Sequence, residues 1–213
     1  GATAVEVAVP GASVAMTRCI SGPVRLDTDI DARFAECILD AGSGADRALF
    51  AAPGAERHVV ALDRCTVRGR VETDAFADGA RDAPDGFGVL RDSAARLATS
   101  DTLFVSDSVP AVEAARRQVG CLRFSYVPDD SLTPRLYRCT DGPAPVFASL
   151  RYADPDYMAL HRTSAETLRR GAENGGEIGA YNRAAHGVRA DNIRRSVDDF
   201  LRFGHAAGIF HET

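Results

Sequence analysis

Three aspartates with the spacing of a strand are the side chains best placed for chemistry. Asp27, Asp29 and Asp31 alternate along the sequence, so on a strand their carboxylates would share one face, about 7 Å from one to the next. Clustered carboxylate oxygens suit Ca²⁺, and paired carboxylates can hydrolyse glycosidic bonds. Leu26 and Ile30 alternate in the opposite sense, which is also typical of a strand with one buried and one solvated face. We therefore assign these carboxylates a catalytic role only if the protein is an enzyme.

A second group of side chains is suited to holding a ligand. Arg123, Tyr126, Tyr137 and Arg138 belong to two short strand-like runs of the sequence. Aromatic rings beside guanidinium groups could bind a sugar or a peptide. The alternative is packing at the edge of a sheet with the arginines in solvent. If the chain binds a ligand, we expect these four residues to contribute.

The cysteines follow a repeat, which has the pattern apolar, any, apolar, any, any, cysteine. Copies cover residues 14–19, 32–37 and 60–65, and a weaker copy over 95–100 has Ser100 in the cysteine position. Alternation within the unit is the periodicity of a strand. A unit of this kind buries its apolar face only by stacking on its neighbours. The repeated cysteines are Cys19, Cys37 and Cys65.

We expect these cysteines to form a structural ladder of small buried side chains inside the stack. The chain has five cysteines, none of them in a C-x-x-C pair, and its five histidines are dispersed. This distribution lacks the ligand spacing of a zinc site, and we predict neither a metal site nor a cofactor.

The elements that must position these residues are predicted to be the strands of a right-handed parallel β-helix, a mainly β solenoid. Cys19 and Cys37 are 18 residues apart, which is close to one turn of a three-sided helix. Later spacings are longer, and the excess has the Gly, Pro and Asp content of loops. We predict outward loop insertions near 42–56 and 77–94, and these loops are candidate recognition elements.

The periodicity changes after residue 150, so we predict a β-helix over 1–150 and a helical C-terminal cap over 151–213. Asp154 and Pro155 have the order of an N-cap and a first helical residue, and Gly171 would end that helix. A second helix is expected from Val188 to Phe203. Such a cap would cover the open end of the solenoid, and the alternative is a docking surface for another subunit.

Composition restricts the classes of partner. The net charge is −5, and all 25 basic residues are arginines scattered among aspartates, so we expect no nucleic-acid partner. The sequence has no apolar run of 18 residues, and we predict no membrane span. Its first residues lack the basic region of a secretory signal, and neither a P-loop nor a G-x-S-x-G motif occurs.

Four stretches resemble a known family. Residues 120–128, 133–139, 149–157 and 192–209 are similar to the C-terminal region of a large family of bacterial proteins described as phage-tail-like. The resemblance implies a β-helix at the end of a multidomain chain, often encoded with contractile-tail or injection-system genes. It implies as partners the N-terminal remainder of a larger chain and other tail or baseplate subunits. It also implies a location in the bacterial cytoplasm or in an assembled tail-like particle, and it implies no particular reaction.

The expected solenoid is compatible with two functions. The first is a non-enzymatic structural or binding module of a tail- or baseplate-like protein, which presents loops on a rigid solenoid. The alternative is a carbohydrate-active enzyme, a polysaccharide hydrolase or lyase that uses the surface carboxylates on a glycan. A trimeric fibre would need an exposed apolar strip, whereas the predicted outward positions are mostly small or charged.

Overall fold

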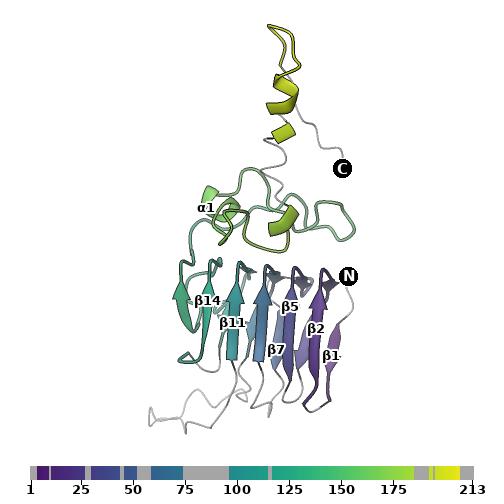
Figure 1. Ribbon diagram of the computed structural model, residues 1–213. Helices are drawn as coiled ribbons and strands as arrows, with labels where there is room; N and C mark the ends of the chain where they lie inside the picture. The colour runs from purple at the N-terminus through teal and green to yellow at the C-terminus, as the bar shows by residue number, and fades with distance from the viewer. Residues whose placement is uncertain are drawn as a thin grey trace.

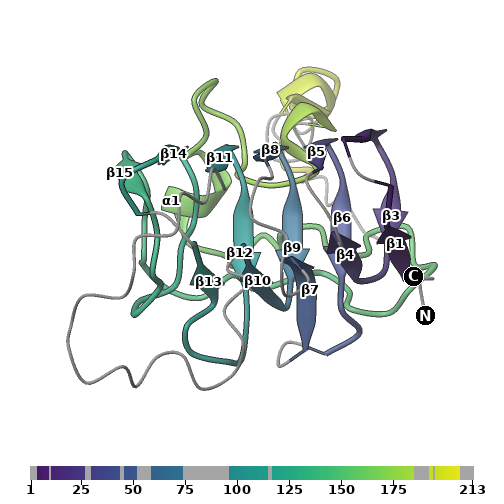
Figure 2. The same ribbon diagram turned by 90° about the horizontal axis from the view of Figure 1, so that it is seen from below.

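Parallel strands dominate the computed structural model of this chain, and the fold is mainly β. The structure describes residues 4–9, 11–26, 30–43, 46–51, 59–73, 96–114, 117–184, 192–193 and 195–206. Within these residues, strands β1 to β15 pair in three parallel sheets, which we call sheets A, B and C (Figures 1 and 2). The short helix α1 (Glu166–Arg169) and the 3-10 helix η2 (Asn182–Ala184) follow the strands in the sequence.

The chain visits the three sheets in turn, so that almost every strand pairs with the strand three places later. Sheet A comprises β1 (Val5–Val7), β4 (Val24–Leu26), β7 (Arg47–Ala51), β10 (Arg70–Glu72) and β13 (Val112–Glu113). Sheet B comprises β2 (Ser13–Thr17), β5 (Asp31–Ala35), β8 (Val59–Asp63), β11 (Arg96–Ser100), β14 (Gly120–Arg123) and β15 (Arg135–Tyr137). Sheet C comprises β3 (Ile20–Ser21), β6 (Ile38–Asp40), β9 (Thr66–Arg68) and β12 (Leu103–Val105).

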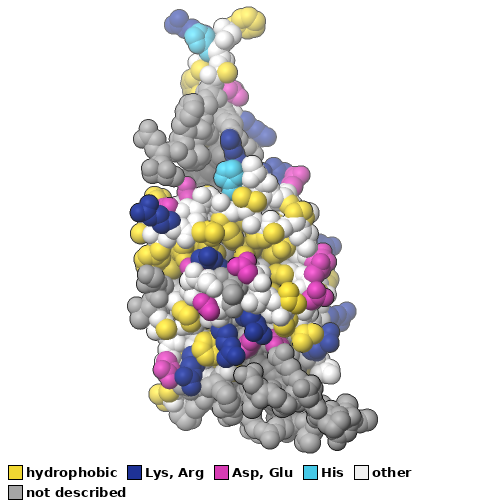
Figure 3. All heavy atoms as spheres, turned by 180° about the vertical axis from the view of Figure 1, so that it is seen from behind, with side chains coloured by type: hydrophobic (Ala, Val, Ile, Leu, Met, Phe, Trp, Pro, Cys, Tyr) yellow, Lys and Arg dark blue, Asp and Glu magenta, His cyan; other side chains and the backbone are white. Residues whose placement is uncertain are grey.

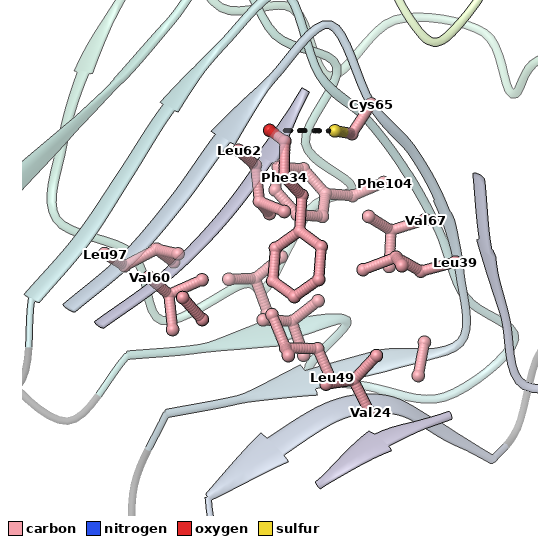
Figure 4. Close-up of a cluster of buried hydrophobic side chains, with 14 of the residues drawn as sticks. Val24, Phe34, Leu39, Leu49, Val60, Leu62, Cys65, Val67, Leu97 and Phe104 are labelled. Atoms are coloured by element: carbon pink, nitrogen blue, oxygen red, sulfur yellow. Dashed lines mark hydrogen bonds between the residues drawn. The ribbon is translucent and has the colours of Figure 1, made fainter. Parts of the chain in front are cut away.

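One hydrophobic core lies between the three sheets. Phe34 of sheet B is 1% exposed and points toward Leu39 of sheet C and Leu49 of sheet A (Figure 4). Sheet B strands bury alternate residues, as Val60 and Leu62 are buried in β8 while Val59, Ala61 and Asp63 are not. The in-register pairing repeats this alternation from strand to strand, and the buried rows therefore form a continuous core.

A sharp corner joins each sheet B strand to the strand or bridge residue that follows it. The corner residue adopts a left-handed conformation with φ between 46° and 56° in every case, although none is glycine. These corner residues are Arg18, Glu36, Arg64, Asp101, Phe124 and Arg138.

A ladder of small donors follows directly after the corner. Its members are Cys19, Cys37, Cys65, Thr102, Ser125 and Cys139, which are aligned by the strand registers. The Cys65 thiol donates to the carbonyl of Phe34 at 3.4 Å, and the Thr102 hydroxyl donates to the carbonyl of Leu62 at 3.4 Å (Figure 4). The ladder side chain thus supplies a donor to a buried carbonyl of the preceding strand. Thr102 occupies the cysteine position of the fourth copy, and the prediction of Ser100 at this position was wrong, since Ser100 pairs with Asp63.

The first predicted loop insertion, at 42–56, contains a strand. Residues 47–51 form β7, which pairs with β4 and β10 and buries Ala48 and Leu49, so the prediction of a loop was wrong for this segment. Ala48 and Leu49 belong to the core between the sheets. The second predicted insertion, at 77–94, lies outside the described residues.

The C-terminal region is mostly turns instead of the expected helices. Between Asp154 and Gly171 only α1 is helical, since Met158 has a φ value of 59° that interrupts a helix, and Ala153 just before the segment has a φ of 78°. Isolated bridges join Leu160 and Tyr157 of this segment to Phe147 and Ser149, which precede it. The second predicted helix begins outside the described residues, and residues 195–198 are helical. The prediction of a long first helix was therefore wrong.

We call residues 141–184 the cover and the described residues before them the body. The cover lies along sheet C, at the ends of the sheet B strands, rather than across the last strand of the body (Figures 1 and 2). Leu168 and Ile178 pack on Leu103 of β12, and Tyr157 packs on Ile38 of β6. Residues 192–193 and 195–206 project away from the cover, and hydrophobic, arginine and histidine side chains lie together at the tip of this projection (Figures 1 and 3).

Candidate functional site

The outward face of sheet B has small side chains where most sheets have large ones. Ala61 of β8 is in register with Ala98 of β11, and Ala98 is in register with Cys121 of β14. Arg33 of β5 and Ala15 of β2 continue this row, and Ala35 lies on the same face two residues after Arg33. The short side chains among them leave a shallow groove of about 520 Å³, which crosses the strands and which we call the sheet B groove.

The charged residues of the groove are mainly arginines. Its described lining contains Arg33, Arg96 and Arg123 but a single carboxylate, Asp63. Arg64 forms an ion pair with Asp63, whereas Arg33 and Arg96 form no ion pair with another described residue. Burial raises the pKa of the Asp63 carboxyl above its ordinary value, although the Arg64 guanidinium acts in the opposite direction. The groove therefore has a surplus of positive charge.

The opposite side of the molecule has a different distribution of charge, since positive and negative side chains are interspersed there (Figure 3). On sheet A, Glu72 pairs with Arg47 at 2.9 Å and with Arg70 at 2.6 Å. Arg70 also approaches Glu113 at 3.5 Å. The arginines of sheet A are thus neutralised by carboxylates of the same sheet. In the sheet B groove, Arg33 and Arg96 have no such partner among the described residues.

Aromatic rings and guanidinium groups meet at the end of the groove nearest β15. Arg123 and Tyr137 are in register on β14 and β15, and the ring of Phe124 lies edge-on to that of Tyr137 with centroids 5.7 Å apart. The guanidinium carbons of Arg123 and Arg138 each lie 5.8 Å from the Phe124 centroid. The structure thus brings Arg123, Tyr137 and Arg138 together. Phe124 joins them because it is the corner residue of its strand, a position that no motif in the sequence marks.

Tyr126 does not belong to this aromatic cluster. It is 5% exposed and packs on Leu103, Leu168 and Ile178 beneath the cover. Burial raises the pKa of its hydroxyl. Tyr126 is therefore part of the contact between body and cover.

Of the three candidate catalytic aspartates, Asp31 alone lies within the described residues. It begins β5 and is exposed on the same side of sheet B as Arg33. Asp27 and Asp29 lie outside the described residues. Asp31 is not part of the groove lining, and its in-register neighbours are Ser13 and Val59.

The cover reaches the groove through one ion pair. Glu173 lies 2.5 Å from Arg123, and its backbone N–H donates to the Asp101 carboxylate at 2.7 Å. Asp101 belongs to the row of corner residues, which we call the corner column. Farther along this column, Arg183 of the cover pairs with the corner residue Glu36 at 2.6 Å. Glu36 also bonds Arg18, and these guanidinium groups hold the pKa of its carboxyl below the ordinary value.

Buried polar groups hold the cover against sheet C. The Tyr157 hydroxyl donates to Asp40, which also lies 3.4 Å from Arg68. Burial and this hydrogen bond raise the pKa of Tyr157. The Tyr181 hydroxyl donates to the Tyr157 carbonyl at 2.7 Å. Glu177 is 7% exposed, and burial raises the pKa of its carboxyl to about 7 despite the nearby charge of Arg169.

Ladder thiols lie apart from the groove chemistry. Cys37 and Cys65 are fully buried, and the pKa of Cys65 is raised by its contact with Cys37 and by burial. In the described part of the chain, no group of three His, Cys, Asp or Glu side chains is arranged to hold a metal ion.

Among the described helices, none has the length and apolar character needed to cross a bilayer. No family model, curated protein or solved structure matches this chain.

Proposed function

We propose that the three sheets are the faces of a right-handed parallel β-helix. The pairing of each strand with the strand three places later supports this proposal, as does the single core that the three sheets share. Right-handed connection is the strong rule for parallel strands joined by crossovers. Such a solenoid is a rigid rod on which one face can present a regular surface.

We propose that the protein is a non-enzymatic binding module that holds an extended ligand in the sheet B groove. The observation that carries the proposal is the groove itself, which contains several alanines and is lined by three arginines, of which Arg33 and Arg96 have no carboxylate partner among the described residues. The resemblance of residues 120–128, 133–139, 149–157 and 192–209 to phage-tail-like proteins suggests the setting, a tail- or baseplate-like assembly in a bacterium. In that setting a rigid groove would attach the assembly to a surface polymer.

The groove favours binding without turnover because its described lining contains one carboxylate, Asp63, which is paired with Arg64. Hydrolysis of glycosides usually employs two carboxylates about 5 to 9.5 Å apart, one of which must exchange a proton. Asp63 is the acidic residue of the described lining, and Arg64 is paired with it. The carbohydrate-active alternative places the chemistry on Asp27, Asp29 and Asp31 instead, and it predicts turnover.

The test measures binding and turnover of a panel of neutral and acidic bacterial polysaccharides. Ala61→Phe and Ala98→Phe fill the groove from an outward-facing position, and Ala8→Phe is the control because Ala8 is exposed on another part of the body. We expect the groove variants to lose binding and the control to retain it. Release of reducing ends that Asp31→Asn abolishes would favour the enzyme, and binding that survives both groove variants would exclude the groove.

A further inference from the structure

Arg123 is the groove arginine that already holds a carboxylate. Glu173 reaches it from the cover at 2.5 Å, and the ring of Phe124 lies 5.8 Å from its guanidinium carbon. The side chains of Arg123 and Glu173 are 44% and 54% exposed, so water screens this ion pair and it contributes little to stability. An incoming carboxylate can therefore replace Glu173 at small cost.

We propose that the ligand of the sheet B groove is a linear glycan bearing carboxylates, and that Glu173 is an internal competitor for its binding at Arg123. The inference rests on the proposed function and gives its ligand a chemical class. The guanidinium fork matches a carboxylate with two parallel hydrogen bonds. Arg33 and Arg96, which pair with no other described residue, receive further carboxylates of the same chain across the strands.

A glycan fits the groove better than a peptide does. Of the strands that form the floor, β5, β8, β11 and β14 are each paired on both sides, and β2 is at the end of sheet B. A peptide strand that added to β2 would lie beside the groove and parallel to the strands, whereas the groove crosses them. The alanine floor has no deep pocket for a peptide side chain. Tyr137 is 48% exposed beside Arg123, and a flat exposed ring is a surface on which a sugar can stack.

Competition is confined to one side chain. The backbone N–H of Glu173 donates to Asp101 at 2.7 Å, and the N–H of Gly179 donates to the Asp101 carbonyl at 2.9 Å. These bonds hold the segment in place when the Glu173 carboxylate leaves Arg123. Removal of that carboxylate therefore changes the affinity for the ligand without detaching the cover.

The experiment titrates the protein with polygalacturonate and with its carboxyl-reduced form, which has the same backbone without the charges. We expect only the acidic polymer to bind. Glu173→Gln should tighten binding about two- to fivefold, the change that corresponds to the loss of an exposed ion pair. Arg123→Gln should weaken binding about tenfold or more, since it removes a charged hydrogen-bonding partner. Arg162→Gln is the matched control, because Arg162 is an exposed arginine of the cover outside the groove.

Some results overturn this inference while the proposed function stands. The groove does not recognise carboxylates if the two polymers bind equally well. The same conclusion follows if Ala98→Phe abolishes binding while Glu173→Gln and Arg123→Gln have no effect on it. Binding of neutral polysaccharides alone would also lead to it. If Ala98→Phe leaves the binding of every polymer unchanged, the groove is not the binding surface, and the proposed function itself fails.

Discussion

Body and cover bury their side chains in different ways. In the body each buried position recurs, so that Phe34 and Leu62 occupy equivalent places on neighbouring sheet B strands. In the cover nothing repeats, and single contacts such as Tyr157 with Asp40 fix its position. The body therefore distributes its stability over many equivalent contacts, while the cover depends on a few. Substitutions should separate the two, and the expected effects are given below from the largest to the smallest.

Removal of a central core side chain tests the body. Phe34 is 1% exposed and contacts residues from all three sheets, so Phe34→Ala should lower the free energy of unfolding by about 3–5 kcal/mol. Denaturant unfolding measures the change. The control is Ile20→Ala, at the uncovered end of sheet C where Ile20 is 45% exposed, which should cost much less. Similar losses for both would mean that the core lacks the packing described here.

The pH dependence of the cover follows from Glu177. Its carboxyl has a pKa of about 7 in the folded protein against an ordinary 4.5, so the folded state binds the proton more tightly. The protonated Glu177 carboxyl thus stabilises the folded cover. Its contribution to the free energy of unfolding is fully present below pH 4.5 and is lost as the pH rises through 7, by at most about 3 kcal/mol. Hydrogen exchange of the cover amides at pH 5 and pH 8 measures it. Glu177→Gln should remove the pH dependence of cover stability. Weaker protection of the cover amides at pH 5 than at pH 8 would contradict the expected direction.

Tyr157→Phe tests whether the cover opens independently of the body. The variant removes the hydroxyl that donates to Asp40 and should cost about 1–3 kcal/mol, since Oδ2 of Asp40 then loses this donor, while Gly42 and Arg68 donate to Oδ1. We expect faster proteolysis of the cover with unchanged unfolding of the body. Tyr152→Phe is the control, because Tyr152 is 50% exposed. An equal loss of body stability would mean that the two regions unfold together.

The ladder should show the smallest effect. Cys65→Ala removes the donor to the Phe34 carbonyl and should cost about 1 kcal/mol, whereas Cys65→Ser keeps a donor. Thr102 and Ser125 show that a hydroxyl is accepted at this position. Thermal unfolding of the two variants measures the difference. A serine variant as unstable as the alanine variant would mean that the ladder requires sulfur for packing.

Repetition explains how much of the fold could be predicted from the sequence. The mainly β, parallel class follows from the recurring alternation, and it is confirmed. The fourth copy was misaligned by two residues because Thr99 is polar at a core position. Its hydroxyl lies 3.3 Å from that of Ser125, so the two satisfy each other inside the core, which a hydropathy pattern cannot reveal.

The cover and the groove had no comparable signal. The turns at Ala153 and Met158 depend on tertiary contacts, such as the burial of Met158 beside Ile38, that override the helix-start pattern of Asp154 and Pro155. The groove is made by alanines, which carry no motif and become a surface only when the register aligns Ala61 with Ala98. Arg123 and Tyr137 could be predicted as ligand-binding candidates because their residue types are informative by themselves.

The corner column has a consequence for how the cover finds its place. A parallel sheet offers equivalent docking positions about every 4.8 Å, so a segment lying across it could slide by one strand. The corner charges differ between neighbouring strands, since Glu36 lies between Arg18 and Arg64, and Asp101 follows Arg64. A slip of one strand in either direction would move Arg183 from Glu36 to an arginine. The alternating charges thus oppose a slip of the cover by one strand on a surface whose backbone is the same at every step.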